Sequence, residues 1–341
     1  MQIIIAGAGK YGRTIAGELV ADGHDVTVIE KEEEVFESTM ESYDLSGVVG
    51  NAASHLVLEE AGVSTCDVFL ALTGSDEVNL VSAIIAQKLG ARKTFARVVN
   101  PDYSTTASLF RTSLGIDAVI NPNLESAQEI MRMLRYPSAI SVESFIRGKV
   151  HIVAVKVPEK SILAGMPMLD FKEECGLDLM VCVIRREGSV FIPDGRTVIQ
   201  PGDTIHVTGK VDTLQSFYAR TNTMAPKIKR VLITGGGAIV YWLLGLMDTK
   251  RYTVKLIERD RKMAELIYKH YPWVDVIRAD GTDPRVLEES NIKHYDAFIA
   301  LTGIDEENVL ASMAASHHGV PKTITKINRT KLLDILGDSE L

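Results

Sequence analysis

The chain has few of the features that mark secreted, membrane-spanning or nucleic-acid-binding proteins. Its 341 residues include three cysteines without a CxxC pair, which excludes a disulfide framework. The longest apolar stretch, Ile239–Met247, is half of the ~18–20 residues of a membrane-spanning helix, and the first residues lack the basic start of a signal peptide. With 37 basic and 45 acidic residues, the net charge of -8 argues against nucleic-acid binding. We therefore expect a soluble cytoplasmic protein.

Residues 1–100 and 229–329 are two copies of one sequence unit. The segment that starts at Ala61 aligns without a gap with the segment that starts at Ser290, and both contain the string ALTG. Chance does not place so many residue types in the same order over this length. The chain therefore contains a duplicated module.

Each copy alternates short apolar runs with stretches of helical spacing. In the first copy, the pattern predicts strands over 3–7, 25–30 and 67–73, and helices over 11–21 and 76–89. This alternation is typical of βαβ units, and hence of a parallel sheet covered on both faces. The predicted fold class is α/β, with two Rossmann-like, doubly wound parallel sheets.

A different pattern fills residues 140–220. Several short strand patterns alternate there with turn-forming triplets such as Pro-Asp-Gly at 193–195, which predicts a small, β-rich α+β module. No second module of this kind follows the second copy, so we expect that the chain is truncated. The predicted domains are residues 1–135, 136–222 and 228–341.

The first copy carries a dinucleotide-binding fingerprint. Gly7, Gly9 and Gly12 follow a strand and open a helix, where they permit a tight turn, the approach of a pyrophosphate and close helix–strand packing. Glu30 ends the next strand, where a carboxylate accepts ribose hydroxyls and repels a 2′-phosphate, so we expect NAD(H) rather than NADP(H). The full predicted first site is Gly7, Ala8, Gly9, Lys10, Tyr11, Gly12, Glu30, Asn51, Thr73, Gly74, Asp76, Asn79 and Arg97.

Several of these residues have two interpretations. Thr73 ends the fourth strand, at the edge where open α/β sheets bind ligands. Asp76 is either a ligand contact or a helix N-cap, and Asn79, one turn later, is equally ambiguous. Arg97 is either a phosphate ligand or a solvated surface residue. Asn51 follows the third strand and is either an adenine contact or a turn residue.

The second copy departs from the fingerprint at one position. Val240 replaces the third glycine, and its β-branched side chain is expected to push the helix away from the strand and to weaken or alter binding. Glu258 and Asp280 are retained, and Lys326 keeps the charge of Arg97. The predicted second site is Gly235, Gly236, Gly237, Ala238, Ile239, Glu258, Asp280 and Lys326.

Catalytic and metal-binding patterns are absent from the sequence. The eight histidines occupy no repeated position and form no Cys–His or H-x-x-E arrangement, and no spacing of acids predicts a metal site. We therefore expect no catalytic residues, no metal and no enzymatic activity.

The motifs GAGKYGRTIAGEL, GNA at 50–52 and ALTGSDEVN at 71–79, with Glu30 and Arg97, resemble the RCK/KTN domain. The order of the three parts resembles the regulatory subunits of Trk potassium uptake systems. This resemblance implies that 136–222 is an RCK C-terminal-type subdomain and that the sites bind NAD(H) or ATP/ADP. It also implies a cytosolic ring of RCK units that docks on an integral membrane transporter of the Trk type, at the inner face of the membrane, and gates it. An aspartate usually stands at Asn51 in the family.

Two other functions stay open. One is the gating ring of a ligand-gated potassium channel, although such rings are normally fused to a pore or made of single units. The other is an NAD-dependent oxidoreductase, which needs a proton-transferring group that the middle module does not offer in a recognisable context.

Overall fold

A computed structural model describes residues 1–104, 107–136, 141–145, 150–221, 227–329 and 332. The chain divides into two compact units, Met1–Glu125 and Ser126–Leu341. No helix in these ranges combines the length and the apolar character that a membrane crossing requires.

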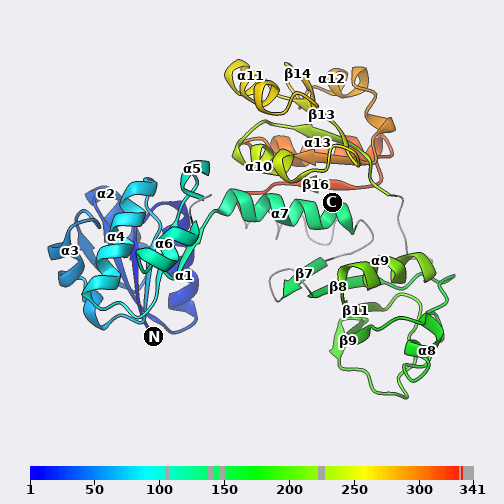
Figure 1. The fold of residues 1–341 in the computed structure, drawn as a ribbon, viewed down its shortest axis with the longest axis horizontal. Coiled ribbons are helices and arrows are strands. Elements are labelled where there is room, and N and C mark those ends of the chain that lie inside the picture. Colours follow the sequence, from blue (N-terminus) through cyan, green and yellow to red (C-terminus); the bar gives the residue numbers. More distant parts are fainter. Residues whose placement is uncertain (105–106, 137–140, 146–149, 222–226, 330–331, 333–341) are drawn as a thin grey trace. The chain divides into compact units, whose positions relative to one another are not determined.

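The first unit, drawn in blue to cyan in Figure 1, is built on a six-stranded parallel sheet with the order β3-β2-β1-β4-β5-β6. Its strands are β1 (Gln2–Ala6), β2 (Asp25–Glu30), β3 (Ser46–Val49), β4 (Val68–Ala71), β5 (Thr94–Arg97) and β6 (Ala118–Ile120). Its helices are α1 (Lys10–Ala21), α2 (Glu33–Ser42), α3 (His55–Glu60), α4 (Asp76–Leu89), α5 (Pro101–Ser104) and α6 (Ala107–Ser113), with a 3-10 turn at Val63–Thr65. The order reverses between β1 and β4, which is the switch point where such sheets bind ligands.

Both faces of this sheet are buried, which explains the nearly continuous apolar runs in its strands. Ile3 and Ile5 of β1 belong to the core that includes Ala16 of α1. Their neighbours Ile4 and Ala6 belong to the core on the other face, with residues of α3 and α4. The alternation follows from the two-residue period of a strand. The predicted doubly wound α/β fold is confirmed.

The middle module is an antiparallel sheet with the order β10-β9-β11-β8-β7. Its elements are β7 (Ser141–Phe145), β8 (Val150–Lys156), α8 (Phe171–Cys175), β9 (Met180–Arg186), β10 (Ser189–Phe191), β11 (Thr204–Gly209) and α9 (Val211–Arg220). Arg186 forms a bidentate ion pair with the buried Asp203, at 2.8 Å for both Nε and Nη2. The predicted β-rich α+β module is confirmed.

The second parallel sheet has the order β14-β13-β12-β15-β16 and repeats five strands of the first. Its elements are β12 (Arg230–Thr234), α10 (Ala238–Leu246), β13 (Thr253–Ile257), α11 (Arg261–His270), β14 (Asp275–Ile277), α12 (Pro284–Glu289), a 3-10 turn at Ile292–His294, β15 (Ala297–Ala300), α13 (Asp305–His317) and β16 (Thr323–Thr325).

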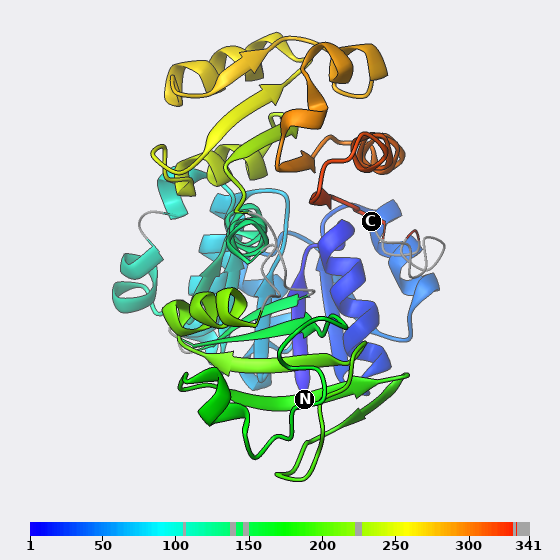
Figure 2. The same cartoon turned by 90° about the vertical axis from the view of Figure 1, so that its right-hand side faces the viewer.

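Helix α10 contains no charged residue, because it is covered on two sides. Val240 and Leu244 of α10 share a core with the second sheet and with Ile130 and Leu134 of α7 (Pro122–Arg135). Figures 1 and 2 both draw α7 beside α10. A helix that lies between the first copy and the middle module thus completes the core of the second sheet. The predicted domain limit at residue 135 remains a prediction.

Candidate functional site

Both copies make a glycine turn between the first strand and the first helix. Gly7 has a φ of 101° and Gly235 a φ of 90°, in the left-handed region that favours glycine. A Cβ at Gly7 would lie 2.8 Å from the Cα of Thr73, and one at Gly235 would lie 2.9 Å from the carbonyl carbon of Leu301. The turn therefore runs directly against the end of the fourth strand, and only glycine fits.

The helix after each turn begins at an open face. Gly9 and Gly237 are the N-caps of α1 and α10, and no side chain caps either helix. A Cβ at either glycine meets no atom within 4 Å. The amide groups of the first helical turn therefore lack a side-chain partner beside open space, which is an arrangement suited to phosphate.

The carboxylate at the end of the second strand contacts the glycine turn. Glu30 is only 9% exposed, and its Oε2 accepts the N–H of Ala8 at 2.7 Å while its Oε1 accepts the N–H groups of Lys31 and Glu32 at 2.8 and 3.1 Å. A carboxylate offers about four acceptor positions, so one remains for a hydroxyl.

In the second copy, Glu258 accepts the N–H of Gly236 and, at 2.6 Å, the N–H of Asp260. The acid therefore holds the glycine loop in both copies.

A buried asparagine ties the fourth strand to the fifth. Asn79 is fully buried, and its Oδ1 accepts the N–H of Thr73 at 2.8 Å and the hydroxyl at 2.7 Å. Its Nδ2 donates to the carbonyls of Thr73 and Arg97 at 3.2 and 2.9 Å. The Arg97 guanidinium donates to the Thr73 carbonyl and lies 4.9 Å from the centre of the Tyr11 ring. Arg97 is thus held at the strand ends rather than free on the surface.

The second copy repeats this set of contacts of a buried asparagine with the ends of the fourth and fifth strands, here called the asparagine clamp. Asn308 bonds to the N–H and carbonyl of Thr302 and to the carbonyl of Lys326, and the Lys326 Nζ donates to the Thr302 carbonyl at 3.3 Å. A cation therefore stands at the same place in both copies.

Asp76 is not the N-cap of α4. Ser75 occupies that position, and its side chain accepts the N–H of Val78, so the N-cap interpretation was wrong by one residue. The Oδ2 of Asp76 instead accepts the N–H groups of Val99 and Asn100 at 3.0 and 2.7 Å. It fixes the loop that follows β5.

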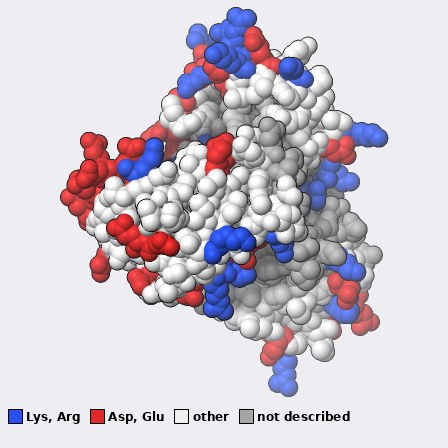
Figure 3. Space-filling view, turned by 60° about the vertical axis from the view of Figure 1, so that its left-hand side comes forward, with Lys and Arg blue, Asp and Glu red and all other residues white. Residues whose placement is uncertain are grey.

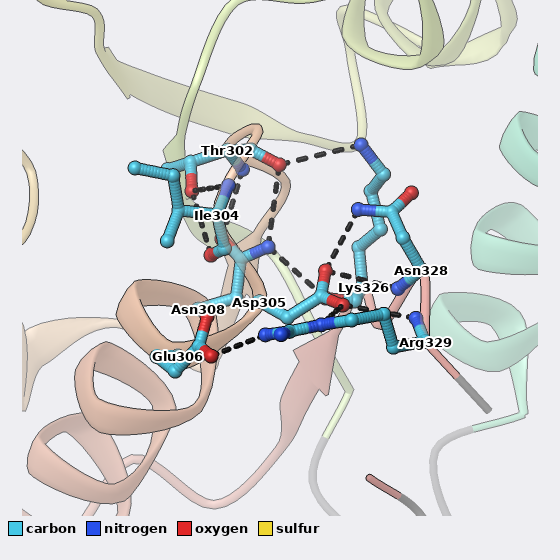
Figure 4. Close-up of polar contacts among 8 residues, drawn as sticks. All are labelled: Thr302, Ile304, Asp305, Glu306, Asn308, Lys326, Asn328 and Arg329. Carbon is cyan, nitrogen blue, oxygen red and sulfur yellow. Dashed lines mark hydrogen bonds and ion pairs between the residues drawn. The ribbon is translucent and has the colours of Figure 1, made fainter. Parts of the chain in front are cut away.

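The equivalent aspartate of the second copy has more partners, and the sequence analysis missed it (Figure 4). Asp305 Oδ1 accepts the N–H and Nδ2 of Asn328 at 2.9 and 2.7 Å, while Oδ2 accepts the N–H of Arg329 and pairs with its Nε at 3.4 Å. Arg329 also pairs with Glu306. Although burial raises the pKa of Asp305, these bonds hold it below its usual value of 3.8. The alignment of Asp305 with Asp76 in the repeat was the signal that pointed to it.

Asn51 and Asp280 both form a local turn. Asn51 Oδ1 accepts the N–H of Ala53 at 2.9 Å. Asp280 Oδ1 accepts the N–H and the hydroxyl of Thr282 at 2.9 and 2.7 Å, and these bonds lower the pKa of Asp280. The turn interpretation therefore describes their geometry, and the adenine contact stays a prediction.

A cavity of about 330 Å³ lies at the carboxyl ends of the second sheet. It is lined by the predicted residues Gly235, Gly236, Gly237, Glu258, Asp280 and Lys326, and also by Ile257, Arg259, Asp260, Met263, Gly281, Thr282, Leu301, Thr302, Gly303 and Glu307. Ala238 and Ile239 are in the first turn of α10 and do not line it.

In the first copy, the predicted residues occupy the equivalent strand ends, with Lys10 and Tyr11 exposed in the first turn of α1. A Cβ at Gly74, after β4, meets no atom within 4 Å. Within the described ranges, no three His, Cys, Asp or Glu side chains come together as a metal site requires.

Two known domain families match the sequence of this chain. The TrkA-N domain model matches residues 3–122 and 231–340, and the TrkA-C domain model matches residues 152–222. The chain belongs to the TrkA family. The resemblance inferred from the motifs is confirmed.

Curated relatives of the TrkA family match over nearly the whole chain. A Trk system potassium uptake protein TrkA homolog of Archaeoglobus fulgidus is 36% identical over 340 residues, which cover 99% of this chain and 77% of that protein. Trk system potassium uptake protein TrkA of Haemophilus influenzae is 31% identical, covering 98% and 74%.

Solved structures show the same fold. The GsuK channel matches with a TM-score of 0.69 and 19% identity over 99% of this chain and 63% of that chain, and the GsuK channel bound to NAD matches with 0.68. At this identity, the likeness concerns the fold alone.

Proposed function

We propose that this chain is a cytosolic regulatory subunit of a potassium uptake system and that it binds NAD(H) or an adenine nucleotide at both strand-end sites. The observation that carries the proposal is the duplicated cradle: a glycine turn against the fourth strand, an uncapped helix start and a buried acid. Relatives named as Trk potassium uptake proteins support the transport role. Structures titled as GsuK bound to NAD and to ADP support the ligand class.

In this proposal, different groups around the cradle bind different parts of the nucleotide. The amides at the starts of α1 and α10 receive the phosphates, since those groups carry partial positive charge and no side chain blocks them. Glu30 and Glu258 accept a ribose hydroxyl beside the glycine turn. Arg97 and Lys326, held at the end of the fourth strand, add positive charge on the far side of the phosphates.

The regulatory step is a shift between conformations of an assembled ring. A nucleotide changes such an equilibrium only by its difference in affinity for the two states. Coupling between sites is typically about 1–3 kcal/mol, and a ring of RCK units adds the contributions of several sites. The ring docks on an integral membrane transporter of the Trk type at the inner face of the membrane.

The test is a calorimetric titration of the full chain with NAD, NADH, ADP, ATP and NADPH. We expect two sites for the parent chain and one site in each of the variants Gly9→Val and Gly237→Val. Both glycines have ordinary φ values near -65° and open space at Cβ, so these side chains block the phosphate position without disturbing the fold. Unchanged thermal unfolding of both variants is the control.

Two outcomes would contradict the proposal. Two bound nucleotides per chain in both variants would show that nucleotides bind elsewhere. If none of the nucleotides gave a binding signal in the parent chain, regulation by a nucleotide would be excluded. Consumption of NADH with a carbonyl substrate would instead identify an oxidoreductase.

A further inference from the structure

The order of the strands arranges the parts of the proposed ligand. The glycine turn follows β12, Glu258 directly follows the adjacent strand β13, and Asp280 follows β14, the next strand outward. Phosphate, ribose and base therefore lie in sequence along this edge. In the first copy, Asn51 follows β3 in the same way. The inference below rests on the proposed nucleotide function and concerns the base.

Asp280 presents an acceptor to this position. Its Oδ1 is occupied by the N–H and hydroxyl of Thr282, and no described residue donates a hydrogen bond to Oδ2. The side chain lines the cavity, and its pKa lies below the usual value because of Thr282, so the carboxylate is ionised at neutral pH. An ionised carboxylate only accepts hydrogen bonds.

Asn51 presents a donor to the equivalent position. The N–H of Ala53 points at its Oδ1, which fixes the orientation of the amide. Because Asn51 is exposed, the two N–H groups of Nδ2 are accessible to a ligand, and no described residue accepts a hydrogen bond from them. The two copies thus offer opposite hydrogen-bonding groups from the same kind of turn.

We propose that these two residues give the sites opposite preferences for position 6 of a purine. Asp280 selects the exocyclic amino group of adenine at the second site, because that group donates. Asn51 accommodates a 6-oxo purine at the first site, because the carbonyl accepts from Nδ2. A 6-oxo group opposite Asp280 places two acceptors face to face, and this costs the hydrogen bond to a charged group.

The test compares NAD with nicotinamide hypoxanthine dinucleotide, which differs only in a 6-oxo group in place of the amino group. Each is titrated into the full-length Gly9→Val chain, which keeps the second site, and into the Gly237→Val chain, which keeps the first. We expect the second site to prefer NAD by about tenfold to a hundredfold. We expect the first site to bind the hypoxanthine analogue at least as tightly as NAD. ADP and IDP form a second matched pair.

Exchanging the two residues is the decisive control. Asp280→Asn in the Gly9→Val chain and Asn51→Asp in the Gly237→Val chain both keep the Oδ1 atom that closes the turn, so the loop should persist. We expect the preference to move with the residue. Equal preference at both sites, or a preference that the exchange leaves unchanged, would overturn this inference while leaving the proposed function intact. Binding of neither dinucleotide nor mononucleotide would overturn both.

Discussion

The two copies keep the same backbone cradle and differ in the side chains around it. Gly7 and Gly235 both have positive φ. Asn79 and Asn308 are both fully buried, and each binds the N–H and carbonyl of a threonine and the carbonyl of a basic residue. Asn79 also accepts the hydroxyl of its threonine. The backbone conformation at the two glycines and the hydrogen bonds of the two asparagines depend on these residue types. Residues that the backbone conformation requires are therefore the same in both copies, whereas the surrounding side chains differ.

The two copies differ in the charge of the helix that follows their second strand. Helix α2 carries the exposed acids Glu33, Glu34, Glu37 and Glu41 and no basic residue, whereas the equivalent α11 carries Arg261, Lys262 and Lys269 with one acid, Glu265. In the view of Figure 3, acidic side chains prevail along one edge, while the basic side chains at the top are mixed with acidic ones. The same fold therefore tolerates opposite electrostatic surroundings.

The largest expected effect comes from making the first copy resemble the second at the third glycine. A Cβ at Gly12 would lie 1.8 Å from the carbonyl oxygen of Gly7, a backbone atom that cannot yield. We expect Gly12→Val to destabilise the first unit by more than about 3 kcal/mol. Hydrogen exchange of the β1 amides measures the loss, and parent-like protection would contradict the prediction.

The reverse exchange, Val240→Gly, tests the second copy. It removes a fully buried side chain and places glycine in a helix, so we expect a loss of about 2–4 kcal/mol, seen in the exchange of the β12 amides.

Removing the asparagine clamp should lower the free energy of unfolding by a similar amount in the two copies. Asn79→Ala and Asn308→Ala each leave backbone groups of a threonine and a basic residue without a partner, so we expect about 2–4 kcal/mol for each. Urea unfolding measures both, with the exposed Ser38→Ala as a control within about 0.5 kcal/mol. A loss confined to one copy would show that the clamps are not equivalent.

The stability of the loop after the fifth strand of the second copy should depend on pH through Asp305. The pKa of Asp305 is lowered in the folded chain, so its contribution is present above the unfolded value of about 3.9 and is lost as the pH falls through the folded value. We expect Asp305→Asn to cost about 1–2 kcal/mol at pH 7.

The difference between variant and parent should shrink as the pH falls below the unfolded value, and it should vanish once the pH lies below the lowered pKa of the folded chain, where the parent carboxyl is protonated. Amide chemical shifts of Asn328 and Arg329 report the transition. A cost that persists unchanged in acid would mean that ionisation is irrelevant to this loop.

The smallest effect is expected at the first helical turn. Tyr11→Ile gives the first copy the residue that the second has at Ile239 and removes the contact with Arg97. We expect a loss of about 0.5–1 kcal/mol in thermal unfolding of the first unit. An unchanged Tm would show that the contact between this ring and the guanidinium adds nothing measurable to the stability of the first unit.

The sequence was sufficient for the sheets and the glycine turns, because periodicity and positive φ leave local signals. It was insufficient for Asp76, whose partners are backbone N–H groups more than 20 residues away. Every residue except proline carries such a donor, so no residue type marks which one is used. The packing of α7 was missed for a related reason: its amphipathic pattern shows that one face is buried, but not against which sheet.

The position of α7 also has a consequence for biosynthesis. The helix leaves the ribosome before the middle module, and the strands whose core it completes begin only at Arg230, nearly 100 residues later. At about 5–20 residues per second, its apolar side waits on the order of 5–20 seconds for that core. The first unit can fold during synthesis, but the apolar face of α7 must be kept from aggregating until the second sheet emerges. Chaperone demand should therefore peak in this interval.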